Sequence, residues 1–158
     1  MRTIVGVAAA LALAVWVGGG AVYTFVLTPA IFAAYPRNTA GEIVGVMMPH
    51  YFRTLLAATA AAALLLPLLW RPWSSRARAL ALALIVGALA AQSWVRWRLY
   101  PEILEVKSRV ASFESAPDAP ERQRFRKLHG LSMAVNLGVL ADGALLLALV
   151  ALAPRRKE

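Results

Sequence analysis

Residues 125–136, FRKLHGLSMAVN, bring together side chains that could do chemistry inside an apolar helix. His129, Ser132, Met133 and Asn136 recur at i, i+3, i+4 and i+7, the spacing of one helical face. A basic segment precedes them and a long apolar segment follows. Lipid offers no hydrogen-bond partner, so a polar stripe entering such a helix must face protein or water. We therefore expect this stripe to look towards another helix.

The segment MMPHYFR, residues 47–53, is the best candidate for the facing helix. Pro49 has no backbone N–H and leaves the carbonyl of Gly45 without its usual partner. Such a carbonyl must find another donor or water. We expect the donor on the helix that carries His129, with a small wet cavity between the two helices. The His129 ring should then face the bundle interior and hydrogen-bond the first or second helix.

Two cofactors are compatible with these residue types. His50 and His129 could bind haem iron from both sides, or hold a soft metal with thioether ligands. The alternative, which the sequence favours, is two separate interfacial histidines and no cofactor. The candidate metal ligands are His50, His129, Met47, Met48 and Met133. The candidate polar-site residues are His129, Ser132, Asn136, His50, Tyr51, Arg53 and Asp142.

Asp142 is the unusual member of that set, because it falls near the middle of an apolar run. An intramembrane carboxyl group is costly and indicates a functional site by default. Its helical face differs from that of the His129–Asn136 stripe. A protonated Asp142 that hydrogen-bonds a neighbouring helix is the structural alternative to a role in transport.

The elements that position these residues follow from the apolar pattern. The chain has 158 residues, is 60% apolar and has a mean hydropathy of +0.62, well above a soluble domain. We predict an all-α integral membrane four-helix bundle, one domain over residues 1–158. Its helices extend beyond the bilayer on the side opposite the termini. The predicted spans are about 4–27, 48–70, 79–100 and 129–153, with a protruding helical hairpin at about 101–128.

Local signals refine these boundaries. The first helix should run over about residues 3–34, kinked at Pro29, with a close approach at the glycines 18–20. Thr39 and Glu42 have capping-box spacing and should open the second helix. The third helix should continue past Pro101, and Asp118 should cap the fourth.

The net charge of +9 is explained by basic residues that flank membrane spans, so we expect lipid contacts and no nucleic acid. The chain has no cysteine, which excludes disulfides and thiolate chemistry. No nucleophile–base pair, phosphate loop or carboxylate dyad indicates an enzyme. Short basic segments at both termini and at residues 71–78 predict cytoplasmic termini in a bacterial-type inner membrane. A homo-oligomer, or a protein partner at the protruding helices, stays open.

Two segments, YTFVLTPAIFAAYPRNTAGEIVGVMMPHYF and RFRKLHGLSMAVNLGVLADG, resemble the transmembrane protein 205 family, also known as a domain of unknown function. The resemblance rests on a P-x-Y-F motif on the second helix and an H-G-x-S-x-x-x-N-L motif on the fourth. The residues are Pro49, Tyr51, Phe52, His129, Gly130, Ser132, Asn136 and Leu137. It implies a four-span helical membrane protein and no settled activity. His50 and Asp142 depart from the family pattern.

Three functions remain open from the sequence. The first is transport of, or tolerance to, a small molecule or metal ion through a polar site between the second and fourth helices. The second is a haem-binding redox protein that uses His50 and His129. The third is a non-catalytic membrane scaffold.

Overall fold

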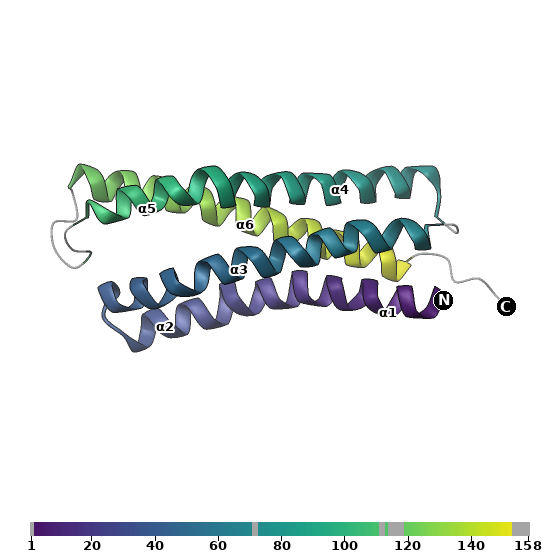
Figure 1. Ribbon diagram of the computed structural model, residues 1–158, viewed down its shortest axis with the longest axis horizontal. Coiled ribbons are helices and arrows are strands. Elements are labelled where there is room, and N and C mark those ends of the chain that lie inside the picture. The colour runs from purple at the N-terminus through teal and green to yellow at the C-terminus, as the bar shows by residue number, and fades with distance from the viewer. Residues whose placement is uncertain (1, 71–72, 111–112, 114–118, 153–158) are drawn as a thin grey trace.

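Four long helices run antiparallel and form one bundle (Figure 1). The computed structural model describes residues 2–70, 73–110, 113 and 119–152, and within them all regular structure is helical. The elements in chain order are α1 (Arg2–Leu13), η1 (Ala14–Gly19), η2 (Val22–Leu27), α2 (Thr28–Ala34), α3 (Arg37–Leu65), η3 (Leu66–Leu69), α4 (Ser75–Trp94), η4 (Val95–Leu99), α5 (Tyr100–Ser108) and α6 (Pro120–Leu152). The predicted fold class is therefore confirmed.

The first and third long helices each contain π-helical turns. Elements η1 and η2 interrupt the first helix, and η4 joins α4 to α5. The π-turn η2 ends two residues before Pro29, and a kink at this proline stays a prediction. The third helix does continue past Pro101, as predicted.

The second long helix starts earlier than the capping-box pattern indicates. Element α3 begins at Arg37 with Pro36 as its N-cap, and no side chain caps it. Thr39 and Glu42 therefore lie inside the first turns, and the predicted capping box is wrong. Pro36 has an extended backbone that starts a helix directly. Pro49 lies within α3 without ending it, and Pro67 lies in the 3₁₀ turn η3. Asp118, the predicted cap of the fourth helix, lies outside the described residues.

All four helices are long and apolar enough to cross a membrane. A helix of their length extends roughly 50 Å, against about 30 Å of hydrocarbon. Large apolar side chains such as Ile4, Val46 and Leu64 are exposed around the bundle, as expected where lipid covers the surface. The start of α1 and the end of α6 lie at the same end of the bundle (Figure 1).

The buried core is centred on Trp16, which is fully buried and donates a hydrogen bond from Nε1 to the carbonyl of Val139 at 3.2 Å. Gly143 allows the first helix to pack closely here, because a Cβ at this position would lie 2.7 Å from Val17. Among the glycines predicted to allow close approach, Gly20 alone faces a neighbouring helix, where its Cβ position is 2.6 Å from a methyl group of Leu140. Gly18 and Gly19 are exposed.

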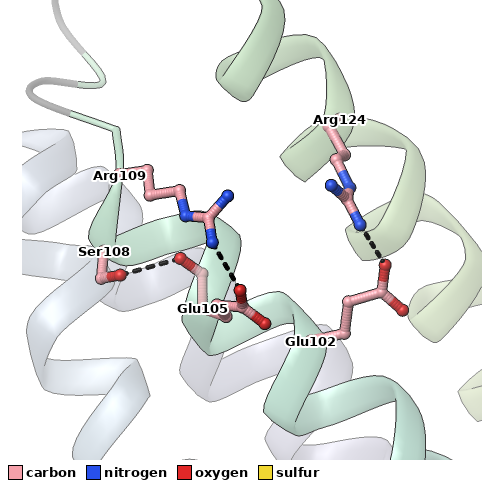
Figure 2. A network of polar contacts seen from close by, with 5 residues as sticks. All are labelled: Glu102, Glu105, Ser108, Arg109 and Arg124. Atoms are coloured by element: carbon pink, nitrogen blue, oxygen red, sulfur yellow. Dashed lines mark hydrogen bonds and ion pairs between the residues drawn. The ribbon is translucent and has the colours of Figure 1, made fainter.

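The end of the bundle opposite the start of α1 is polar. Arg124 of α6 pairs with Glu102 of α5 at 2.8 Å, and Arg109 pairs with Glu105 one turn away (Figure 2). These pairs are exposed, so each contributes at most about 1 kcal/mol. The Asn38 side chain accepts a hydrogen bond from the backbone of Phe113 and ties the start of α3 to the segment that follows α5.

Candidate functional site

A hydrogen-bonded chain of neutral polar groups connects three of the four helices. The Tyr51 hydroxyl on α3 donates to Oδ1 of Asn136 on α6 at 2.5 Å. Nδ2 of Asn136 in turn donates to the hydroxyl of Thr24 in η2 at 2.9 Å. In a membrane such bonds are worth about 0.5–2 kcal/mol each and fix how the helices face one another. Tyr51 and Asn136 are both predicted polar-site residues, and the fold brings them into contact.

Aromatic rings pack around Tyr51 and its neighbour Phe52. Tyr23 of η2 stacks on Tyr51 with ring centroids 4.2 Å apart. Its hydroxyl points to the Met48 sulfur at 3.8 Å. On the other side of Tyr51, Phe52 meets the edge of Tyr100 of α5 with centroids 5.1 Å apart. The Tyr51 ring is thus held against the first long helix, and its neighbour Phe52 packs against the third.

A second polar pair lies deeper in the bundle. Nε2 of Gln92 on α4 donates to the Thr59 hydroxyl on α3 at 2.8 Å, and Thr59 donates to the carbonyl of Leu55 at 2.9 Å. Both side chains are buried. The other amide atom, Gln92 Oε1, is buried without a hydrogen-bond partner among the described residues. A buried acceptor of this kind costs about 1–3 kcal/mol.

A small cavity of about 20 Å³ joins the two polar pairs. This volume holds about one water molecule. The lining residues come from α3, α4, η4 and α6: Tyr51, Phe52, Leu55, Gln92, Val95, Ser132, Val135, Asn136 and Val139. A cavity does lie between the second and fourth helices, where one was expected, but its lining is mostly apolar, and that it holds water stays a prediction. The third helix supplies a further wall that was not predicted.

The carbonyl of Gly45 finds its donor on another helix, as predicted. The donor is the Tyr100 hydroxyl of α5 at 3.4 Å, so the prediction that α6 would supply it is wrong. The reason is packing, because α6 lies mainly against α4 and α5. Lys107, two turns along α5, donates to the carbonyl of Gly41 at 2.8 Å.

His129 does not face the bundle interior. Its side chain is exposed and its ring stacks on Phe125 of the same helix, with centroids 5.6 Å apart. Leu128 and Val135 pack against the small apolar cluster of the third helix instead. The inward face of α6 thus passes through Leu128, Ser132 and Val135. Of the predicted stripe, Ser132 and Asn136 line the cavity, whereas His129 and Met133 are exposed. The prediction for the His129 ring is wrong.

His50 is also exposed, and Nδ1 of its ring is 3.2 Å from the Arg53 guanidinium on the same helix. Within the described residues, no contact joins the two imidazoles. Met133 is exposed, and the described residues contain no group of three or more histidine or acidic side chains that could hold a metal ion. The site that geometry assembles consists of neutral hydroxyl and amide groups.

Asp142 lies apart from this cavity. Its Oδ2 is 3.9 Å from the Cβ position of Gly87, which places the carboxyl group where α6 meets α4. Its side chain is partly exposed, in contrast to its buried neighbour Gly143.

Sequence reasoning missed Thr24, Thr59 and Gln92. Gln92 carried a readable signal, because it is the one amide side chain in residues 79–95. The two threonines gave none, since an isolated threonine in an apolar helix usually bonds its own backbone.

The fold and these contacts define a four-helix membrane-spanning protein with a neutral polar site inside the bundle. Residues 11–112 match the family described as a domain of unknown function (DUF4149). Since this match covers more than half of the chain, the protein belongs to that family. Comparison with curated proteins and with solved structures gave no match.

Proposed function

We propose that the protein binds a small polar solute in the cavity between α3, α4 and α6 and passes it across the membrane. The observation that carries this proposal is the buried, unpartnered carbonyl oxygen of Gln92 beside that cavity. In the structure this oxygen has almost no exposed surface, so a solute that donates a hydrogen bond would satisfy it only once the cavity widens. The Ser132 hydroxyl lines the same cavity and could hold a second group of the solute.

The lining is mostly apolar, with amide and hydroxyl groups and no charged residue among its members, and this favours a small neutral solute over a transition metal. Amide and hydroxyl oxygens are weak ligands for soft metals, which prefer imidazole and thioether groups. The histidines and Met133 lie exposed, away from the cavity lining. This refines the broader expectation of small-molecule or metal-ion transport.

The cavity must widen to pass anything larger than water. The π-turn η4 lines the cavity through Val95, and the π-turn η2 is bonded through Thr24 to the lining residue Asn136. Such turns are frequent at functional sites and leave part of the helical ladder with altered hydrogen bonds. Rearrangement of these turns would move Thr24 and Val95 relative to Asn136 and open the cavity.

Several finer assignments accompany this proposal. We propose that the chain is a bacterial-type member of the transmembrane protein 205 family, supported by the contact between Tyr51 and Asn136, one residue from each family motif. We also propose one domain over residues 1–158, cytoplasmic termini, and ends of the helices that protrude from the membrane opposite them. Protein partners would dock on that protruding end.

The test uses purified protein in lipid vesicles with urea, glycerol and methylammonium as probes. Stopped-flow light scattering measures how fast vesicles re-swell after an inward gradient of each probe. The wild type should accelerate re-swelling for at least one probe, and Gln92→Leu should abolish that acceleration. Glu105→Gln, at an exposed ion pair far along α5, should keep it.

Wild-type rates equal to those of Gln92→Leu for every probe would refute the transport proposal and favour the scaffold. A visible spectrum of the same sample addresses the haem alternative. A Soret band that disappears in His50→Ala and His129→Ala would replace the proposed function with a redox one.

A further inference from the structure

Asp142 is the sole ionisable residue in the apolar centre of the four helices. This follows directly from the sequence of the segments concerned. They are residues 3–22, 54–69, 79–95 and 130–152. A charged carboxylate at this depth costs several kcal/mol or more, so its presence needs a reason.

Asp142 has no structural partner among the described residues. Gly87 of α4 faces it where the two helices meet, with its Cβ position 3.9 Å from Oδ2, an ordinary van der Waals distance that offers no hydrogen bond. Among the described residues it makes no hydrogen bond, ion pair or ring contact. A carboxyl group that served only packing would have found a donor, as Asn136 and Gln92 do.

The neighbouring elements supply no charge either. Around Asp142, α6 packs against α4 and η1, which carry Gly87 and the apolar pair Trp16 and Val17 at this level. The charged groups of α4 lie at its start, at Arg76 and Arg78, and those of the third helix resume only at Arg96. Within the part of the chain that the structure describes, no cation is therefore positioned to neutralise a carboxylate, and a proton is the remaining means.

We propose that Asp142 is a reversible proton-binding site at the α4–α6 seam, separate from the polar cavity. The carboxylate takes one proton from the aqueous phase and becomes a neutral carboxylic acid, and it returns that proton on release. Asp142 does not line the cavity, so we assign its proton the role of a coupling ion for a solute that passes through the cavity. The coupling role rests on the proposed transport function, whereas the proton site itself does not.

Infrared difference spectroscopy of the protein in lipid vesicles tests the proton site directly. Spectra are taken between about pH 5 and about pH 9, the range over which buried carboxyl groups titrate. The wild type should show the carbonyl stretch of a protonated carboxyl group at low pH and lose it as the pH rises. Asp142→Asn should lack this band, and Asp142→Glu should keep a titrating one. Glu102→Gln is the control, because Glu102 is partly exposed and paired with Arg124, so the band should survive.

A second reagent tests access from the membrane. Dicyclohexylcarbodiimide partitions into lipid and adds to protonated carboxyl groups. Mass spectrometry of wild-type peptides should place the adduct on Asp142, and added bulk in Gly87→Leu should slow its formation. An Asp142-dependent band that stays unchanged over the whole pH range would overturn the proposal. So would the absence of such a band at every pH.

Transport measurements separate the two proposals. If Asp142 titrates but the wild type moves no probe, the proton site stands and the proposed function fails. If the wild type moves a probe, a pH gradient should drive its accumulation in the wild type and not in Asp142→Asn. Accumulation that Asp142→Asn leaves intact would refute coupling.

Discussion

Gln92 and Asn136 show how single amide side chains organise the interior of this bundle. Asn136 uses both ends of its amide, accepting from Tyr51 and donating to Thr24. Gln92 uses one end, on Thr59, and leaves its carbonyl oxygen unpaired. The first arrangement stabilises the fold, whereas the second costs stability and is the kind of exception found at functional sites.

This difference predicts opposite effects of removing polar partners around Gln92. Thr59→Val should lower stability by about 1–3 kcal/mol, because it leaves the Gln92 amide donor unpaired as well. Adding Gln92→Leu to that variant should recover most of the loss, since both partners are then apolar. Apparent melting temperatures in detergent measure both effects. A double variant less stable than Thr59→Val would contradict this account.

The Tyr51–Asn136 bond should show coupling in a double-mutant cycle. Tyr51→Phe and Asn136→Leu each remove it, so their combined cost should fall short of the sum by about 0.5–2 kcal/mol. Unfolding by denaturant in mixed micelles provides the measurement. The pair Tyr35→Phe and Asn136→Leu is the control, because Tyr35 is exposed and lies outside the network, and its effects should add.

At the scale of elements, close helix packing depends on glycine at particular positions. Gly143 lies under Trp16 and Val17, whereas Gly138, just over one turn earlier on α6, has no neighbouring atom within 4 Å of its Cβ position. The two glycines share one helix and differ only in what they face.

Gly143→Ala should therefore destabilise the protein by about 1–3 kcal/mol through overpacking. Gly138→Ala should be neutral or stabilising by up to about 1 kcal/mol, because alanine favours the helix. Apparent melting temperatures of the two variants, measured side by side, check this. Equal shifts would mean that α6 packs differently around Trp16.

The contact between α3 and α5 at Gly45 can be tested through Pro49 and Tyr100. Pro49→Ala returns an amide donor to the Gly45 carbonyl, so the Tyr100 hydroxyl no longer supplies its only bond. Tyr100→Phe should cost about 1 kcal/mol in the wild type and distinctly less in Pro49→Ala. Denaturant unfolding of the four variants gives the comparison. An unchanged cost in both backgrounds would show that the 3.4 Å contact contributes nothing.

For the whole molecule, the orientation in the membrane is the property most open to experiment. Short basic segments flank the termini, and the start of α1 and the end of α6 lie at one end of the bundle (Figure 1). We expect a green fluorescent reporter fused after Glu158 to fluoresce and an alkaline phosphatase fused there to be inactive, as cytoplasmic termini require. Phosphatase inserted after Ala119 should be active. The reverse pattern would invert the orientation.

The sequence alone determined the number, length and apolar character of the helices, because each property is encoded in runs of neighbouring residues. It also indicated that Pro49 would leave the Gly45 carbonyl in need of a donor. Helix packing decided which group donates to this carbonyl. Because α6 lies against α4 and α5, the donor is the Tyr100 hydroxyl of α5. The orientation of His129 was also decided by packing. Spacings of three and four residues fit two adjacent stripes of α6 nearly equally well, and the contacts of Leu128 and Val135 determine which stripe faces inward. The tertiary structure likewise brings Thr59 and Gln92 into hydrogen-bond contact, although they are 33 positions apart and no local sequence pattern predicts the bond.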